Sequence, residues 1–221
     1  TRRSSDLDYK GFQAPLTVPL GTITATQFLN LDASIWGFEL ESQWVPIDNL
    51  QIMFNYAYLN TELDSGCCFV DTADPFATAP GAQPAAPAPG GRVAQSVVGN
   101  NLPLSPENKV TVGANYRFEL GAGTLTLNAS ATYVDPQQST LFNNPIYRTQ
   151  SFTTGDLRAL WKDSEDRFTI IGFVKNVTDE TGYGSSTANP AGVSAVGARR
   201  QVALVRAVHA VRAHLAESGG R

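Results

Sequence analysis

Residues 108–133, NKVTVGANYRFELGAGTLTLNASATY, constrain the fold more than any other stretch, because two alternating runs flank a very short turn. In each run every second residue is apolar, and the residues between are polar or small. Side chains alternate across a β-strand with period two, so each run predicts a strand with one apolar and one polar face. Each run is about ten residues long, the length that a tilted strand needs to cross the hydrocarbon core of a bilayer.

The same alternation predicts further strands over residues 33–45, 50–60, 151–161 and about 168–176. In the first of these, Glu39 and Glu41 share one face, and burying unpaired carboxylates in an apolar core is costly, so that face is expected to be wet. A carboxylate pair also suits glycoside hydrolysis, but lining a wet face explains it without catalysis. The alternation is imperfect in residues 50–60, and it weakens in the last strand, where Ile171 and Phe173 lie opposite the other apolar residues.

The connections between the predicted strands alternate in length. Three short turns and three longer loops follow from the pattern: turns at 46–49, 120–123 and 162–167, and loops at 61–107, 135–150 and 177–196. Short periplasmic turns and longer extracellular loops are typical of transmembrane barrels, whereas a soluble β-sandwich needs no such strict alternation. The longest loop contains a run rich in Ala and Pro, which favours an extended chain over a hidden domain.

We therefore predict an all-β fold, an antiparallel transmembrane β-barrel segment: a partial barrel of about seven or eight strands with long extracellular loops. Barrel strands point polar side chains into the lumen and apolar ones at lipid, with aromatic girdles at both interfaces. The candidate lumen-facing residues are Glu39, Glu41, Lys109, Asn115, Arg117, Asn128, Asp156 and Arg158. The candidate lipid-facing girdle consists of Trp36, Trp44, Tyr58, Tyr133 and Trp161. The alternative is that these aromatic side chains belong to the core of a soluble β-rich domain.

Composition disfavours several other classes of protein. The formal net charge of -4 gives no general basic surface, so no nucleic-acid partner is expected. No run approaches the roughly 18 apolar residues of a membrane helix. The chain begins at Thr1 without a signal-peptide pattern, and we expect a trimmed or truncated N-terminus.

No catalytic or cofactor-binding constellation is visible, so we predict that the chain is not an enzyme and holds no cofactor or metal. Cys67 and Cys68 are adjacent and lack the spacing of zinc or redox motifs. We expect a loop disulfide, formed either between these two residues or with a partner outside the chain. His209 and His214 are five residues apart, which would place them about 140° apart on a helix and disfavours metal ligation.

Both ends of the chain depart from the pattern. Residues 1–32 are poorly periodic and contain prolines and glycines, so they are predicted to be a partial strand followed by a loop. Residues 33–197 form the predicted barrel segment. Residues 198–221 are an atypical tail, in which residues 202–216 suit a helix at least as well as a strand. We interpret this tail as an altered reading of the last strand, such as a frameshift, and the alternative is a divergent natural end.

Three stretches, in their order along the chain, resemble motifs of the barrel of TonB-dependent outer-membrane receptors. They are ASIWGFELE, NLPLSPENKVTVGANYRF and FTIIGFVKNVTDETGY, which together span residues 33–183. The last stretch contains Asn176, Asp179 and Tyr183, which resemble the signature at the end of a late strand in that family. The family usually finishes with a strand that has a terminal aromatic residue, whereas this chain finishes with Arg221.

The resemblance implies a barrel of about 22 strands with a plugged lumen, of which this chain supplies about the last third. Such receptors take up a scarce ligand such as a siderophore, cobalamin or a saccharide, and an inner-membrane TonB complex drives uptake through the plug. The implied partners are outer-membrane lipid, the missing N-terminal barrel and plug of the same receptor, the TonB coupling complex acting through that plug, and an unknown small ligand. The implied location is the outer membrane of a Gram-negative bacterium.

Two other function classes stay open at this stage: a small closed outer-membrane barrel, either porin-like or an enzyme, and a soluble β-rich binding domain. The identity of the ligand does not follow from the sequence. Four residues of the loop at 135–150 are candidate ligand contacts, with an ordinary loop role as the alternative: Phe142, Asn143, Asn144 and Tyr147.

Overall fold

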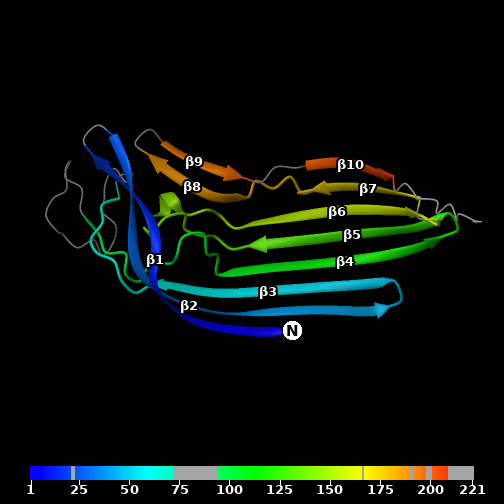
Figure 1. The fold of residues 1–221 in the computed structure, drawn as a ribbon, viewed down its shortest axis with the longest axis horizontal. Coiled ribbons are helices and arrows are strands. Elements are labelled where there is room, and N and C mark those ends of the chain that lie inside the picture. Colours follow the sequence, from blue (N-terminus) through cyan, green and yellow to red (C-terminus); the bar gives the residue numbers. More distant parts are fainter. Residues whose placement is uncertain (21–22, 72–93, 166, 190–191, 198–200, 209–221) are drawn as a thin grey trace, which may run out of the picture.

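Figure 1 shows one broad antiparallel sheet whose strands lie side by side, with short turns at one end and longer connections at the other. The computed structural model describes residues 1–20, 23–71, 94–165, 167–189, 192–197 and 201–208. Within these residues, eight strands form the sheet in the order β1-β2-β3-β4-β5-β6-β7-β10. They are β1 (Arg2–Leu20), β2 (Ile23–Ile47), β3 (Leu50–Leu63), β4 (Asn108–Leu120), β5 (Gly123–Val134), β6 (Phe152–Asp163), β7 (Phe168–Lys175) and β10 (Gln201–Val208). We call the two ends of the sheet the turn end and the loop end.

The sheet is an open wall. β1 and β10 lie at its two edges, and in the part of the chain that the structure describes no strand pairing joins them. The one helix among the described residues is η1 (Pro145–Tyr147), a single 3-10 turn. No helix in that part of the chain is long and apolar enough to cross a membrane. The predicted all-β fold and the predicted number of strands are confirmed.

The hairpin predicted over residues 108–133 is present as β4 and β5. Its strands pair without a shift of register as far as Leu120 and Gly123, which lie opposite each other at the turn. Gly123 has a φ of 150°, and a Cβ atom there would lie 2.1 Å from the carbonyl oxygen of Lys162 on β6. Only glycine fits at this position, because any side chain would collide with the backbone of the neighbouring strand.

Residues 2–20 form β1, so the loop that we expected within residues 1–32 is wrong. β1 runs antiparallel to β2, and the two strands form a hairpin that reaches beyond the rest of the sheet at the loop end. Prolines such as Pro15 favoured a loop, but β1 is an edge strand of the sheet, where a missing backbone N–H is tolerated. The segment boundary expected at residue 33 therefore falls inside β2.

The tail begins with a strand. β10 pairs antiparallel with β7, from Gln201 opposite Lys175 to Val208 opposite Phe168. For residues 201–208, the helical alternative is therefore wrong, because the backbone of β7 supplies a row of hydrogen-bond partners that outweighs local helix propensity. The remaining tail, with both histidines, lies outside the described residues.

Two of the longer connections contain regular structure of their own. The connection between β7 and β10, predicted as a loop over residues 177–196, contains a separate two-stranded sheet of β8 (Tyr183–Asn189) and β9 (Gly192–Gly197). The connection at 135–150 contains η1. The Ala- and Pro-rich part of the longest connection lies outside the described residues.

A buried apolar cluster lies at the loop end of the sheet, and we call it the loop-end cluster. It joins three parts of the chain: the β1–β2 hairpin, the connection after β3 and the connection after β5. Its members are Ala14, Leu16, Leu29, Leu31, Ala33, Leu63, Val97, Leu102, Leu141, Phe142 and Tyr147. Along β2, Leu31 and Ala33 are even-numbered steps from Glu39, so the cluster lies on the same face of the sheet as that glutamate.

Candidate functional site

All eight candidate lumen-facing residues lie on one face of the sheet, which we call the polar face. In an antiparallel sheet, residues directly opposite each other point to the same side. Through such pairs, Glu39 shares a face with Lys109 across β2, β3 and β4, and Asn128 shares it with Arg158 across β5 and β6. The remaining members lie at even-numbered steps along the same strands: Glu41, Asn115, Arg117 and Asp156. The register therefore brings together the set that the alternation predicts.

A ladder of amide side chains crosses three strands of the polar face. The Nδ2 group of Asn115 donates to Oε1 of Gln51 at 3.3 Å, and the Nδ2 group of Asn128 donates to Oδ1 of Asn115. Arg158 lies opposite Asn128 and extends the row to β6. Beside the ladder is a groove of about 430 Å³ at the turn end, lined by polar side chains such as Arg117 and also by the apolar side chains of Val45 and Leu50. This surface can exchange hydrogen bonds with a polar partner or with water.

Glu39 and Glu41 are exposed side chains at alternate positions of β2. On β3 they lie opposite Ala57 and Asn55, and on β1 Glu39 lies opposite Arg3. Glu39 therefore has the cation Arg3 on one side and the uncharged Ala57 on the other. These neighbours suit a solvated surface with balanced charges better than a pair of catalytic carboxylates. In the part of the chain that the structure describes, no group of three His, Cys, Asp or Glu residues is placed to hold a metal ion.

The five predicted girdle residues share the opposite face, which we call the apolar face. Trp36, Tyr58 and Tyr133 lie toward the loop end, and the rings of Trp36 and Tyr58 are 5.1 Å apart. Trp44 and Trp161 lie toward the turn end. Trp44 is 61% exposed and Trp36 is 48% exposed. Such a broad exposed apolar face requires an apolar surrounding, which disfavours the soluble-domain alternative.

The candidate ligand contacts in the connection after β5 are mainly structural residues. Phe142 and Tyr147 belong to the loop-end cluster, and the Tyr147 hydroxyl donates to the buried carboxylate of Asp71. Asn144 is also buried and caps η1, since its Oδ1 atom accepts from the N–H of Ile146 at 3.1 Å. This burial favours the ordinary-loop alternative for these three residues. Of the four candidates, only Asn143 is exposed.

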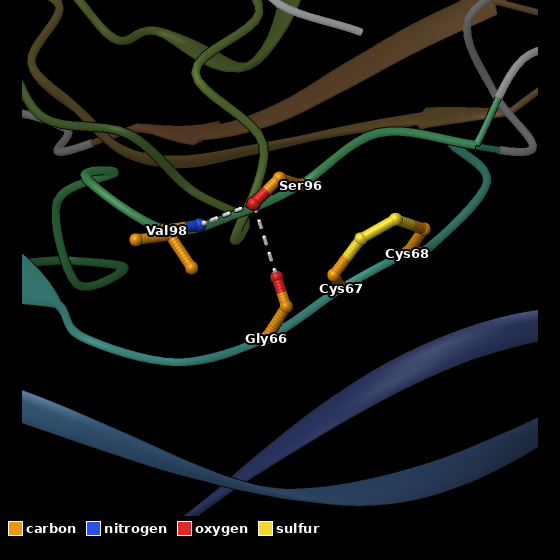
Figure 2. The surroundings of a disulfide bond; sticks show 5 residues. All are labelled: Gly66, Cys67, Cys68, Ser96 and Val98. Carbon is orange, nitrogen blue, oxygen red and sulfur yellow. Dashed lines mark hydrogen bonds between the residues drawn. A yellow bond between two sulfur atoms is a disulfide. The ribbon is translucent and has the colours of Figure 1, made fainter. Parts of the chain in front are cut away.

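Cys67 and Cys68 form a disulfide with each other in the connection after β3 (Figure 2). Of the two pairings that the sequence left open, this is the one within the chain. The carbonyl oxygen of the preceding Gly66 accepts a hydrogen bond from the Ser96 hydroxyl at 3.4 Å, and that hydroxyl accepts from the N–H of Val98 at 3.2 Å. The disulfide thus follows the point at which residues near Gly66 are hydrogen-bonded to residues near Ser96 of the same connection. Because it joins adjacent residues, it closes no long loop of chain.

Of the family-type signature Asn176, Asp179 and Tyr183, the first residue shapes the turn after β7. Asn176 is buried and has a φ of 51°. Its Oδ1 atom accepts from the N–H of Glu180 at 3.1 Å, and its Nδ2 group donates to the Glu180 carbonyl at 2.8 Å. The backbone N–H of Asn176 donates to Oδ1 of Asp156 at 2.8 Å. Asp156, one of the candidate lumen-facing residues, therefore also stabilises this turn. Asn176 is therefore a structural residue of this turn, a physical role that the sequence resemblance did not reveal.

An ion pair closes the turn between β6 and β7, beyond Trp161. The Arg167 Nε group donates to Oδ2 of Asp163 at 2.8 Å, and Glu165 lies 3.3 Å from the same Nε atom. This hydrogen bond is the main reason that the pKa of Asp163 is lowered, and it raises the pKa of Arg167. The turn is therefore held by a carboxylate that stays charged to lower pH than an ordinary aspartate.

The comparisons with known proteins agree with this geometry. The family described as TonB dependent receptor-like, beta-barrel matches residues 6–177, which is well over half of the chain. The chain belongs to this family. Receptors of the family are outer-membrane β-barrels of Gram-negative bacteria that bind small ligands and work with TonB. A comparison with curated protein sequences gives no match.

Several solved uptake and siderophore receptors share the fold. The ferric yersiniabactin uptake receptor FyuA of Yersinia pestis aligns with 92% of this chain at a TM-score of 0.61 and 17% identity. The siderophore receptor PiuA of Acinetobacter baumannii aligns with 91% at 0.61 and 20% identity. The ferric preacinetobactin receptor BauA of the same species aligns with 92% at 0.56 and 19% identity. The chain spans only 29%, 24% and 26% of these three receptors, respectively, so it corresponds to part of a barrel wall.

Proposed function

We propose that the chain forms part of the barrel wall of an outer-membrane receptor that takes up a scarce ligand by TonB-coupled transport. One observation carries this proposal: the register collects the predicted polar residues on one face and the aromatic girdle on the other. A barrel in a membrane requires this division, with water inside and lipid outside. In this proposal the polar face lines the lumen, the apolar face meets lipid, and the loop end is extracellular.

The rest of the receptor completes the activity. Because the chain spans less than a third of the solved receptors, an N-terminal part of the barrel and a plug are proposed to come from outside residues 1–221. TonB would act through that plug, and this chain would supply wall and loops. The proposed role is transport and reception without catalysis.

A ferric siderophore is the first ligand class to test. Three solved receptors of this fold are described as siderophore or ferric-siderophore receptors, which supports the choice, and cobalamin and saccharides are the alternatives. The test is to delete the gene that encodes this chain and to measure uptake of labelled ferric siderophores, cobalamin and oligosaccharides under limitation for each. Loss of uptake of one ligand, restored by the intact gene, is expected. Unchanged uptake of all three classes would contradict the transport proposal.

A separate experiment tests the two faces. Leu127 and Asn128 are neighbours on β5 that point to opposite sides of the sheet. The native cysteines are joined in a disulfide, so a single new cysteine can be labelled cleanly without reductant. In outer membranes, a charged thiol reagent is expected to label Asn128→Cys and to spare Leu127→Cys. Labelling of both variants, or recovery of the protein in the soluble fraction, would overturn the barrel-wall assignment.

A further inference from the structure

A broad groove lies on the apolar face, where β4, β5, β6 and β7 run side by side (Figure 1). Its volume is about 760 Å³, and four of the residues that line it are small: Ala114, Ala129, Ala159 and Gly172. The strand register places Ala114 opposite Ala129, and it places Ala159 opposite Gly172 one row closer to the turn end. We call these four residues the apolar trough.

Larger apolar side chains border the trough. Leu127 lies opposite Ala159, and Leu157 lies opposite Ala129, so each row of small residues continues into a leucine. Both leucines are exposed and line the same groove. Because a leucine side chain stands higher above the sheet than an alanine methyl group, the trough runs obliquely across four strands between aliphatic walls. A flexible apolar chain lying in it makes van der Waals contacts with the floor and with both walls.

The trough lies between the two parts of the aromatic girdle. Trp161, toward the turn end, is two residues from Ala159 on β6, and Tyr133, toward the loop end, is four residues from Ala129 on β5. In the proposed function, this zone of the apolar face meets the hydrocarbon part of the bilayer. An acyl chain of a membrane lipid is therefore the occupant that suits both the shape and the position of the trough.

A positive charge lies at the turn end, in line with the trough along β7. Gly172 is four residues from Phe168, which is about 13 Å along a strand. The rings of Phe168 and Trp161 are 5.4 Å apart, and the Arg167 guanidinium lies 5.8 Å from the centre of the Phe168 ring. Arg167 is thus at the edge of the apolar face, at the level where lipid head groups meet an aromatic girdle.

The charges beside Arg167 indicate the kind of head group that fits. The Nε atom of Arg167 lies 2.8 Å from Asp163 and 3.3 Å from Glu165, and the side chains of Arg167 and Glu165 are exposed. A guanidinium has five N–H donors and pairs well with phosphate oxygens. The two carboxylates would repel a purely anionic head group, but they attract an ammonium group. The turn therefore complements a head group that carries both a phosphate and an ammonium.

We propose that the apolar trough and the turn with Arg167 and Glu165 form one binding site for a single zwitterionic phospholipid with an ethanolamine head group. The trough holds part of an acyl chain, Arg167 binds the phosphate, and Glu165 accepts hydrogen bonds from the ammonium group. This lipid stays bound while the lipids around the wall exchange. The proposal rests on the proposed function, since it requires the apolar face to meet lipid.

A phosphatidylethanolamine with a photoreactive group in one acyl chain tests the trough. The receptor encoded by the whole gene is reconstituted in phosphatidylglycerol bilayers with a trace of this probe, and adducts are mapped to peptides. We expect adducts on the strands of the trough that unlabelled phosphatidylethanolamine displaces. Ala129→Leu fills the trough and should lower these adducts about tenfold. Ala131→Leu adds the same side chain to the same face of β5 outside the trough and should leave them unchanged.

The contrary results separate this site from the barrel wall. Adducts that unlabelled phosphatidylethanolamine does not displace, or equal effects of Ala129→Leu and Ala131→Leu, overturn the site, because ordinary lipid contact is not saturable and depends on no single residue. A trough without adducts on an otherwise labelled apolar face also overturns it, and a second copy of the receptor seated there would give this result. These outcomes leave the barrel wall intact. Adducts on the polar face in place of the apolar face overturn the site together with the proposed function.

The head-group part of the site has its own matched variants. Arg167→Gln should lower the adducts about tenfold, because a charge-assisted hydrogen bond to the phosphate is lost. Lys162→Gln removes an exposed cation that lies near the same turn but on the polar face, and it should leave the adducts unchanged. Glu165→Gln should reduce the preference for phosphatidylethanolamine over phosphatidylglycerol in competition. Equal effects of Arg167→Gln and Lys162→Gln, or an unchanged preference in Glu165→Gln, overturn the proposed site.

Discussion

Replacing Leu63 by alanine tests whether the loop-end cluster is one packed unit. Leu63 ends β3, is fully buried, and lies among cluster residues from three parts of the chain. A Leu→Ala change in a packed core costs about 2–5 kcal/mol, because apolar contacts are lost and a cavity remains. Since 1.4 kcal/mol is a factor of ten in an equilibrium constant, opening of the cluster should become about 30-fold more frequent or more.

Hydrogen exchange of the whole receptor, purified in detergent, measures this opening directly. The N–H of Gly99 donates to the carbonyl oxygen of Leu63 at 2.9 Å, and the N–H of Val97 donates to that of Gly66 at 3.0 Å. Both amides are expected to exchange faster in Leu63→Ala. The neighbouring Glu62 is exposed, so Glu62→Ala is the matched control and should leave these rates unchanged.

Amides of β4 and β5 provide an internal reference, because they lie in the sheet away from the cluster. Unchanged exchange at Val97 and Gly99 would refute the idea that the cluster holds these connections. An equal increase throughout β4 and β5 would refute the idea that the cluster opens separately from the sheet.

Three further predictions concern the sheet and its turns. Gly123→Ala should destabilise the β4–β5 hairpin by about 1–3 kcal/mol, measured by thermal unfolding in detergent, because its Cβ would collide with β6. Arg167→Gln should raise the pKa of Asp163 toward 3.8, measured by NMR titration. In the unmutated protein, the hydrogen bond stabilises the turn above pH 3.8, and this stabilisation is lost as the pH falls through the lower pKa of folded Asp163. Ala129→Lys, on the apolar face, should lower the free energy of unfolding in a bilayer by about 2–4 kcal/mol, and Ser130→Lys, on the polar face, by much less.

Each of these predictions has a contrary result. A Cβ at Gly121 would meet no atom within 4 Å, so equal losses in Gly121→Ala and Gly123→Ala would contradict the collision argument. An unchanged Asp163 titration in Arg167→Gln would contradict the hydrogen bond as the cause of the shift. Equal losses from lysine on the two faces of β5 would contradict the division between lipid and lumen.

The two faces of the sheet were predictable from the sequence because their signal is local. Residues 108–133 alternate so strictly that strand length, turn position and the two faces follow from counting. The same rule located most of the sheet, and it also marked Ile171 and Phe173 as departures. It failed in β1, where proline and glycine suggested a loop although Ala14 and Leu16 follow the alternation.

The candidate ligand contacts could not be judged from the sequence, because their burial depends on segments far away along the chain. Phe142 and Tyr147 are buried by the β1–β2 hairpin and by residues near Val97, which no local pattern connects to them. β10 likewise became a strand because β7 offers it a partner, although its own composition is compatible with a helix.

The sequence by itself determined the period of the strands, the order of turns and loops and the family resemblance, because these depend on neighbouring residues alone. The tertiary structure decided which row of polar residues becomes an amide ladder, that Cys67 and Cys68 pair with each other, and why Asn176 is needed in its turn. It also placed Leu160 opposite Ile171, so that residues which only weaken the alternation in the sequence lie side by side as apolar residues on the polar face. The physical reason is that the register between strands is set by the hydrophobic pattern of both strands together with the geometry of the turn, and only the register brings distant side chains together.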